Sequence, residues 1–342
     1  MEIVKLYPMS PFHLGERGIG VEETSDIIHS DTLFSAIAHN WRIFYGNRDL
    51  ESLLKLFNKN PPFLISSAYP FAKEVLFFPR PFIKDFKPEL RKKFKKVRFV
   101  SQKVFEELIE DKIPEENFIQ KDKIWITKNE RDKLRELEDS KREITIWKKT
   151  ERPRVALDLI SSSANIYHFG EVVFSEGCGY YFLVDYRNNN CKSKLEPVIR
   201  LLGEEGIGGD RTSGRGLFEL KDNKDNFKEF ALNISNSNKN FVTLSLYHPT
   251  KEEVKKEFLQ KSNYELITRK GWIYSPDINN LRRRTIRMFA EGSVFPKQEK
   301  KEIYGDLADV TPKILKEHKG YKNGHRVCRY GYAFKIPAKV RE

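Results

Sequence analysis

Six glycines fall within eighteen residues of one segment, GEEGIGGDRTSGRGLFEL at 203–220, and the elements on either side limit the folds that can hold it. The apolar residues before it recur at helical spacing and predict a helix, whereas LFEL at its end is typical of a strand. Nucleotide-binding loops of the P-loop and dinucleotide types run from strand to helix, because phosphate sits at the positive N-terminal end of the helix. Here a helix enters the loop and a strand leaves it, which argues against both folds. The residues at helical spacing are Leu195, Val198, Ile199 and Leu202.

The residues within the loop lead to the same conclusion. Two of its glycines have P-loop spacing, but Arg215 and Gly216 stand where the phosphate-binding lysine and the magnesium-binding hydroxyl are required. A dinucleotide fingerprint begun at Gly206 would need a glycine at 211, where the chain has Arg211. We therefore expect no nucleotide-hydrolysing site, no cofactor and no metal here.

A glycine-rich loop can still bind anions, because successive backbone N–H groups form a concave donor surface. Arg211 and Arg215 would add forked donors for phosphate oxygens. Glycines also let a nucleic-acid backbone approach without meeting a Cβ atom. On this interpretation, valine at Gly208 or Gly209 weakens binding and leaves the fold intact. The alternative is a long structural turn with solvated arginines.

The charge of the whole chain also favours a polyanionic partner. The sequence has 62 Lys and Arg against 49 Asp and Glu, a formal net charge of +13, which indicates nucleic acid first and an anionic membrane second. No apolar run approaches the roughly 18 residues of a membrane span, and the N-terminus lacks the pattern of a secretory signal. The three cysteines form no paired motif. We expect a cytoplasmic protein with no membrane partner.

The order of predicted elements indicates an α+β fold in two halves. A strand is expected at 2–8, a helix beginning at Ser30 or Asp31 and ending at Gly46, and a hairpin in which HFGEVVF and GYYFLVDY flank SEGCG. Each half fits a split βαβ, ferredoxin-like (RRM-like) plan better than an alternating parallel one. Residues 73–152 are highly charged and resemble an insertion, with an amphipathic helix expected at 82–99. The predicted divisions are 1–72, the insertion 73–152, 153–235 with the glycine loop, and 236–342.

Several blocks of the chain carry a family resemblance. GIGGDRTSGRGLFEL closely resembles the glycine-rich loop of the RAMP superfamily of CRISPR–Cas proteins, and SDTLFSAIAHNW looks like the first helix of these proteins. Further blocks resemble the member of type III-A effector complexes that caps the 5′ end of the crRNA: FFPRPF, SANIYHFGEVVF, LSLYHPT, RKGWIYS and RMFAEGSVF. The blocks occur in order over nearly the whole chain, with only the charged insertion unmarked.

The resemblance implies two ferredoxin-like domains, the first with a protruding thumb. It implies a crRNA-binding subunit that grips the 5′ repeat-derived tag and meets the crRNA–target RNA duplex. The neighbours would be the large polymerase/nuclease subunit and a backbone RAMP subunit. The similarity is to the RAMP groups that scaffold, and not to those that cut. The predicted RNA contacts are His13, Ser30, Gly206, Ile207, Gly208, Gly209, Asp210, Arg211, Thr212, Ser213, Gly214, Arg215, Gly216, Arg283 and Arg284.

Two of the segments concerned have alternative interpretations. Arg283 and Arg284 belong to the basic run NNLRRRTIRMF, read as a strand, which could face RNA, an acidic partner or solvent. The aromatic residues of FFPRPF could wedge against splayed bases or anchor the insertion to its domain. These aromatic residues are Phe77, Phe78 and Phe82.

The sequence favours a protein that is not an enzyme. Metal-independent RNA cleavage needs a general base and acid, usually histidine. His13 and His29 flank the first loop and could approach the glycine loop, but no tight catalytic constellation is visible. Asp31 is interpreted as a helix cap, and Asp210 as a tie within the glycine loop. A crRNA-processing endoribonuclease and a protein–protein adaptor remain as alternatives.

Overall fold

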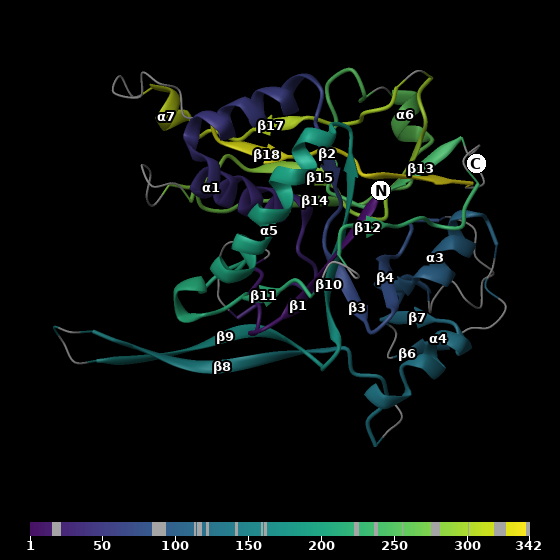
Figure 1. Ribbon diagram of the computed structural model, residues 1–342, viewed down its shortest axis with the longest axis horizontal. Coiled ribbons are helices and arrows are strands. Elements are labelled where there is room, and N and C mark those ends of the chain that lie inside the picture. The colour runs from purple at the N-terminus through teal and green to yellow at the C-terminus, as the bar shows by residue number, and fades with distance from the viewer. Residues whose placement is uncertain are drawn as a thin grey trace.

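The fold is known from a computed structural model (Figure 1). The first half has the ferredoxin-like order of elements, strand–helix–strand–strand–helix–strand. Its strands form an antiparallel sheet in the order β11-β1-β10-β3, and β2 also pairs with β10. The elements are β1 (Glu2–Pro8), α1 (Ser30–Lys59), β2 (Phe63–Ile65), β3 (Tyr69–Ala72), β10 (Cys178–Tyr186), η2 (Asn189–Cys191), α5 (Lys192–Glu205), η3 (Arg211–Ser213), β11 (Phe218–Glu219) and β12 (Lys228–Glu229). The structure describes residues 1–15, 22–83, 94–112, 114, 118–120, 123–140, 143–158, 160, 163–221, 226–235, 239–254, 256–274, 281–299, 301–317 and 326–339.

The helix predicted at Ser30 forms but does not end at Gly46. Gly46 has φ 85° and ψ 171°, which kinks α1, and helical structure resumes and continues to Lys59. The cap assignment of Asp31 is also wrong, because His29 occupies the N-cap position and no side chain caps the helix. Both differences arise for the same reason. A glycine or an aspartate shows where a helix can begin, bend or end, but it does not determine which of these happens or which residue is the cap.

The charged segment extends the sheet of the first half. Beyond β3 the strand order continues β4-β5-β7-β6, and the predicted division at residue 73 falls inside the β3–β4 hairpin. Phe77 and Phe78 are completely buried, which supports the anchoring interpretation of FFPRPF. Of the helix expected at 82–99, residues 84–93 lie outside the described part. The elements are β4 (Val75–Pro79), β5 (Phe99–Ser101), α3 (Gln102–Ile109), β6 (Phe118–Gln120), β7 (Ile124–Ile126), α4 (Lys128–Lys133) and η1 (Arg135–Leu137).

A long two-stranded ribbon projects from the body of the molecule (Figure 1). It consists of β8 (Trp147–Leu157) and β9 (Ala164–Phe174), paired from end to end. The sequence placed β9 in a hairpin with β10. The tight turn between them exists, but β9 pairs with β8, while β10 pairs with β1, β2 and β3. The protruding ribbon therefore begins within the last residues of the charged segment, at Trp147, and most of it lies beyond residue 152.

The second half follows the same plan with an interrupted strand. β13 pairs with β16 and β19, β15 pairs with β14, and the Tyr247–Phe289 bridge joins β15 to the chain that follows β13. If β15 and β16 count as one strand, the order is β19-β13-β15/β16-β14, which is again ferredoxin-like. The elements are β13 (Asn240–Thr243), α6 (Lys256–Gln260), β14 (Leu266–Arg269), β15 (Ile286–Phe289), β16 (Val294–Pro296), β17 (Leu307–Asp309), α7 (Lys313–Glu317), β18 (Cys328–Tyr330) and β19 (Lys335–Ala338).

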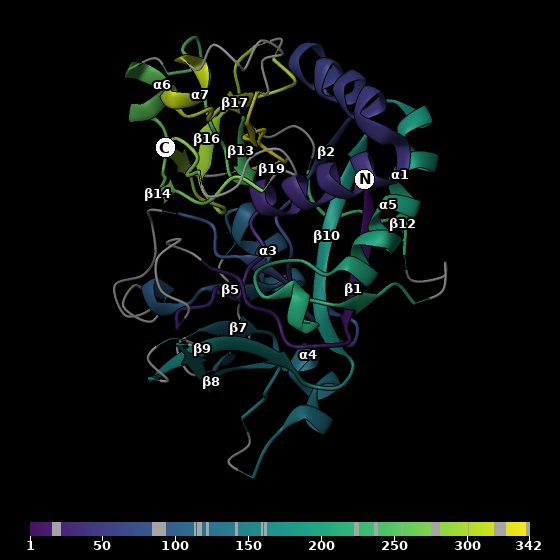
Figure 2. The same cartoon turned by 90° about the vertical axis from the view of Figure 1, so that its left-hand side faces the viewer.

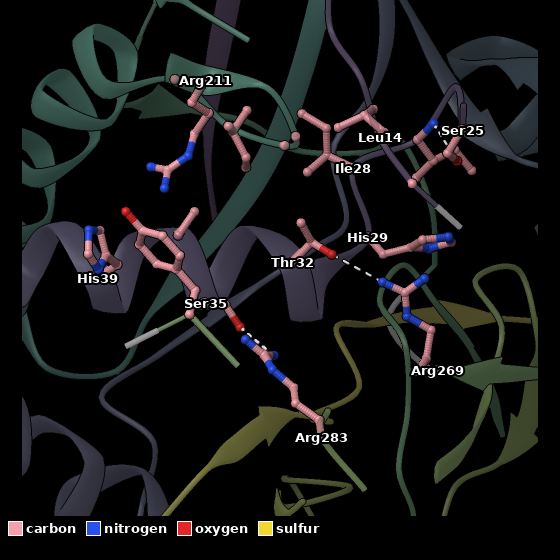
Figure 3. Close-up of a pocket in the computed structure, with 18 residues that line it drawn as sticks. Leu14, Ser25, Ile28, His29, Thr32, Ser35, His39, Arg211, Arg269 and Arg283 are labelled. Carbon is pink, nitrogen blue, oxygen red and sulfur yellow. Dashed lines mark hydrogen bonds between the residues drawn. The ribbon is translucent and has the colours of Figure 1, made fainter. Parts of the chain in front are cut away.

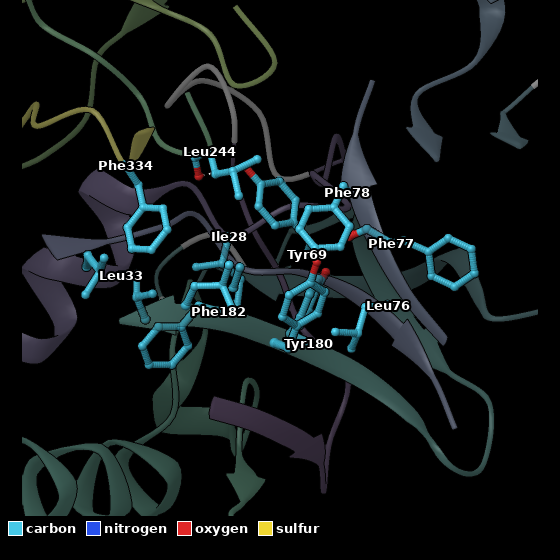
Figure 4. Packing of buried hydrophobic residues seen from close by; sticks show 14 of the residues in the cluster. Ile28, Leu33, Tyr69, Leu76, Phe77, Phe78, Tyr180, Phe182, Leu244 and Phe334 are labelled. Atoms are coloured by element: carbon cyan, nitrogen blue, oxygen red, sulfur yellow. Dashed lines mark hydrogen bonds between the residues drawn. The ribbon is translucent and has the colours of Figure 1, made fainter. Parts of the chain in front are cut away.

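The main hydrophobic core extends across both halves (Figure 4), and the second half has two smaller clusters of its own. Leu244 and Phe334 from the second half pack in the same cluster as Tyr69 and Phe182 from the first. Hydrogen bonds cross the same boundary, since the Tyr69 hydroxyl donates to the Leu244 carbonyl at 2.7 Å. Among the described helices, none combines the length and the apolar character needed to cross a bilayer.

Candidate nucleic-acid interface

A pocket of about 330 Å³ opens where four parts of the chain meet (Figure 3). These parts are the glycine loop, the loop between β1 and α1, the first turns of α1, and a wall from the second half. Arg211 enters from the loop, and Arg269 and Arg283 enter from the opposite side. Of the predicted RNA contacts, six line this pocket: Gly206, Ile207, Gly208, Gly209, Arg211 and Arg283.

The crowded glycines of the loop pack against protein. The Gly209 N–H donates to the His13 carbonyl oxygen at 2.9 Å. Gly208 has φ +103°, and a Cβ atom there would overlap that same carbonyl oxygen. A Cβ atom at Gly209 would lie 2.7 Å from the His13 ring. The space that the sequence assigned to a nucleic-acid backbone is therefore filled by His13, and valine at either position should disturb the loop itself.

The two loop arginines have different surroundings. The Nε atom of Arg215 lies 2.8 Å from a carboxylate oxygen of Glu171, which is 2% exposed. The Arg211 guanidinium instead lies 4.8 Å from the ring centroid of Tyr274 at the pocket wall. Arg215 is thus committed to a buried carboxylate, and Arg211 is directed to the pocket. Both arginines were predicted to bind phosphate, and the geometry supports this prediction for Arg211 alone.

A buried ion network stands behind the pocket. Arg269 donates two hydrogen bonds of 2.9 Å to the Asp31 carboxylate, and Arg329 donates a third. Burial by itself would raise the pKa of Asp31, but the two guanidinium groups outweigh it and hold the pKa well below its usual value. Burial and repulsion from Arg329 lower the pKa of the neighbouring Arg283 to about 10. Two buried arginines thus share one aspartate, the half-buried Arg283 lies nearby, and the region is net positive.

Both histidines of the first loop are held through the Nδ1 atom of the ring. The His13 Nδ1 atom lies 2.7 Å from the Gly170 carbonyl oxygen. The His29 Nδ1 atom lies 2.7 Å from a Glu291 oxygen, and the Ser67 hydroxyl donates to the same oxygen at 2.5 Å. Burial would raise the pKa of Glu291, but His29 and Ser67 together lower it. Both rings are therefore held by protein groups.

The remaining predicted contacts divide by exposure. Ser30 is completely buried, its hydroxyl accepts from the Leu246 N–H at 3.1 Å, and its own N–H donates to Ser67. It has no group to offer RNA in this structure. Arg284 is exposed and donates to the Asp309 carbonyl at 2.5 Å, in the segment before β15 and not in a strand as expected. Outside the pocket lie His13, Ser30, Asp210, Thr212, Ser213, Gly214, Arg215, Gly216 and Arg284, of which Thr212, Ser213 and Arg284 are exposed.

His39 and Tyr274 are among the pocket residues that sequence reasoning missed. Tyr274 is 65% exposed, and its ring lies 4.8 Å from that of His39 on α1. Burial, with repulsion from Arg42 and Arg211, lowers the pKa of His39. The signal for Tyr274 was the pair of aromatic residues in RKGWIYS beside basic residues. Nothing local to the sequence brings that segment to the helix.

Comparisons with known proteins agree over nearly the whole chain. The RAMP superfamily matches residues 5–219, and the CRISPR Csm4 C-terminal domain matches residues 236–338. The CRISPR system Cms protein Csm4 of Methanocaldococcus jannaschii is 30% identical over 348 residues, covering 91% of this chain and 89% of the relative. The Csm4 protein of Thermococcus onnurineus is 29% identical and covers 78% and 81%.

Solved structures show the same fold. A chain of a Csm3–Csm4 subcomplex of the type III-A CRISPR-Cas interference complex aligns with a TM-score of 0.67 at 24% identity, covering 98% of this chain and 99% of that one. A chain of a Csm1–Csm4 cassette in complex with cA4 aligns with a TM-score of 0.60 at 22% identity, covering 100% and 98%. With the family match over more than half its length and a 30% identical relative along nearly all of it, this chain belongs to the RAMP superfamily and, within it, to the Csm4 family.

Proposed function

We propose that the chain is a non-catalytic crRNA-binding subunit of a type III-A CRISPR interference complex, which holds the 5′ repeat-derived tag at its glycine-loop pocket. The observation that carries the proposal is the set of donors at this pocket. Within the described residues, neither Arg211 nor Arg283 forms an ion pair with a carboxylate, and both line the pocket. A net positive, partly buried site of this kind favours an anionic ligand.

The pocket suits a nucleotide of a single strand. Arg211 and Arg283 face each other across it and can donate to phosphate oxygens (Figure 3). The exposed Tyr274 ring gives a base a surface for stacking, and such stacking is how sequence-tolerant single-strand binders gain affinity. The exposed hydroxyls of Thr212 and Ser213 extend the donor surface beyond the pocket.

The partners follow from the relatives. Structures of relatives hold Csm4 with Csm3 and with Csm1. We propose that this chain likewise docks a backbone RAMP subunit and the large polymerase/nuclease subunit, and that it meets the crRNA–target duplex in the assembled complex. The predicted divisions of the chain stay part of this proposal.

The competing function is cleavage of the repeat RNA. Such cleavage would need a histidine as general base. His13 and His29 are each held by a protein group through Nδ1, so either ring would have to take the proton through Nε2. Incubating the purified chain with a labelled repeat transcript, with and without EDTA, separates the functions. Binding without cleavage is expected. Cleavage would show that the chain is an endoribonuclease and not a scaffold. If the chain neither binds nor cleaves the transcript, a protein–protein adaptor is favoured.

Replacing Arg211 with alanine should weaken binding of the repeat transcript by about 1–1.5 kcal/mol, the value of one charge-assisted contact. The slope of log affinity against log salt should become shallower by about 0.7, as expected for one lost single-strand phosphate contact. Fluorescence anisotropy over a salt series measures both. Arg200→Ala on the exposed face of α5 is the control, because Arg200 lies outside the pocket. If Arg211→Ala and Arg200→Ala bind the transcript with equal affinity, the RNA strand binds at a place other than the Arg211 pocket.

Replacing Tyr274 with alanine should also weaken binding, by about 1–3 kcal/mol, through loss of a stacked base. No charge is removed, so the salt slope should stay that of the unmodified protein. Tyr274→Phe keeps the ring and should bind within about twofold of the original. If the alanine and phenylalanine variants bind alike, the ring carries no base and the phosphate contacts act alone.

A further inference from the structure

Two ion pairs join the glycine loop to the projecting ribbon. Arg154 of β8 donates to the Asp210 carboxylate, and Arg215 pairs with Glu171 of β9. Asp210 and Arg215 stand on either side of the η3 turn, Arg211–Ser213, which carries the exposed donors. The turn is thus fastened to the ribbon at both ends. Figures 1 and 2 show the ribbon beside the loop that follows α5.

A stack of side chains supports the same junction. The centroid of the Phe169 ring of β9 lies 4.3 Å from the Arg154 guanidinium carbon and 4.3 Å from the centroid of the His13 ring. His13 also joins the two elements directly, because its ring contacts the Gly170 carbonyl and its own carbonyl accepts from Gly209. Hydrogen bonding from Arg154 is the main cause that lowers the pKa of Asp210. The loop and the ribbon from Glu171 out to Arg154 therefore form one packed unit.

We propose that Asp210 and Glu171 are positioning residues for RNA, which lock the ribbon to the glycine loop so that the ribbon's orientation and RNA binding at η3 are coupled. The inference rests on the proposed function for its ligand, a single-stranded RNA. Both residues are carboxylates beside a phosphate-binding turn, and simple charge would make them unfavourable to RNA. On this proposal, Asp210 and Glu171 favour RNA binding because they hold Arg154, Arg215 and the η3 turn in place. Coupling of this kind is reciprocal, so bound RNA must also steady the ribbon.

Asp210→Asn gives the sharpest test, because charge and positioning predict opposite signs. Asp210 has φ 60°, a conformation that asparagine tolerates, so the substitution removes charge without backbone strain. If charge alone matters, the variant binds the repeat transcript more tightly. If the ion pair positions the turn, affinity falls about fivefold or more, within the usual range of coupling between sites. Glu171→Gln is the second variant and should act in the same direction.

Hydrogen exchange of the full chain, measured first without RNA, is a test that does not depend on the ligand. Asp210→Asn should speed the exchange of β8–β9 amides near Arg154 by about fivefold. When the repeat transcript is then added to the unmodified protein, the same amides should exchange more slowly. Glu151→Gln removes an exposed carboxylate elsewhere on β8 and should change neither exchange nor affinity beyond twofold. Arg154→Lys keeps the charge and should restore most of the protection that Arg154→Gln loses.

The outcomes separate this inference from the proposed function. If the unmodified chain binds no RNA, the proposed function fails, while faster ribbon exchange in Asp210→Asn still supports the lock between ribbon and loop. If Asp210→Asn binds RNA as tightly as the original or more tightly, the two carboxylates do not position the turn. Unchanged ribbon exchange in both carboxylate variants overturns the lock itself.

Discussion

Replacing Asp31 with asparagine should lower the free energy of unfolding by about 3–5 kcal/mol, because it leaves buried guanidinium groups without their counter-charge. Arg269 and Arg329 are 4% and 3% exposed, so water cannot take the place of the carboxylate. Asparagine has nearly the same shape, and the cost is therefore electrostatic. Equilibrium unfolding in urea, followed by circular dichroism, measures the change.

Asp26→Asn is the matched control. Asp26 is also buried, but its partners Arg98 and Lys149 are each 43% exposed and stay hydrated when the carboxylate is lost. We expect a loss of about 1–2 kcal/mol there. A difference of less than 1 kcal/mol between the two variants would mean that the Asp31 network does not stabilise the junction of the two halves.

The pH dependence has a definite sign. The folded-state pKa of Asp31 lies below its unfolded value, so its contribution is fully present above the unfolded pKa of about 3.9. It is lost as the pH falls from about 4 toward the depressed folded value. The stability difference between the original protein and Asp31→Asn should therefore be constant near neutral pH and shrink below about pH 4.

Replacing Gly208 with alanine should destabilise the loop by about 2–5 kcal/mol. A positive φ costs an L-residue about 1–2 kcal/mol, and the overlap of Cβ with the His13 carbonyl oxygen adds about 1–3 kcal/mol of overpacking. Because that oxygen belongs to the backbone, it cannot rotate away. The Gly209–His13 hydrogen bond should break and Arg211 should move, so affinity for the repeat transcript should fall with stability.

Gly214→Ala is the control for this prediction. Gly214 also has a positive φ, +73°, but nothing lies within 4 Å of a Cβ atom there. Only the backbone cost of about 1–2 kcal/mol is expected. Thermal unfolding and anisotropy on both variants make the comparison. If the Gly208 variant is no less stable than the Gly214 variant, the loop yields freely and its contact with His13 is weak.

Much of the fold could be predicted from local pattern. The strand at 2–8 and the helix at 192–205 form as expected, because their apolar periodicity lies in contiguous residues. The ferredoxin-like plan follows from the order of such elements. The pairing of β9 with β8 could not be predicted, because the segment WKKTERPR lacks apolar alternation and its strand is defined by its partner.

The sequence alone determined that the glycine loop follows a helix, lacks the nucleotide-binding residues and places two arginines four residues apart. Only the tertiary structure decided which arginine faces the pocket. Arg215 meets Glu171 from β9, whereas Arg211 meets Tyr274 from the second half. Asp31 likewise meets Arg269 and Arg329, 238 and 298 residues away. Periodicity is a property of neighbouring residues, but the partner of a charged side chain is set by packing between distant segments.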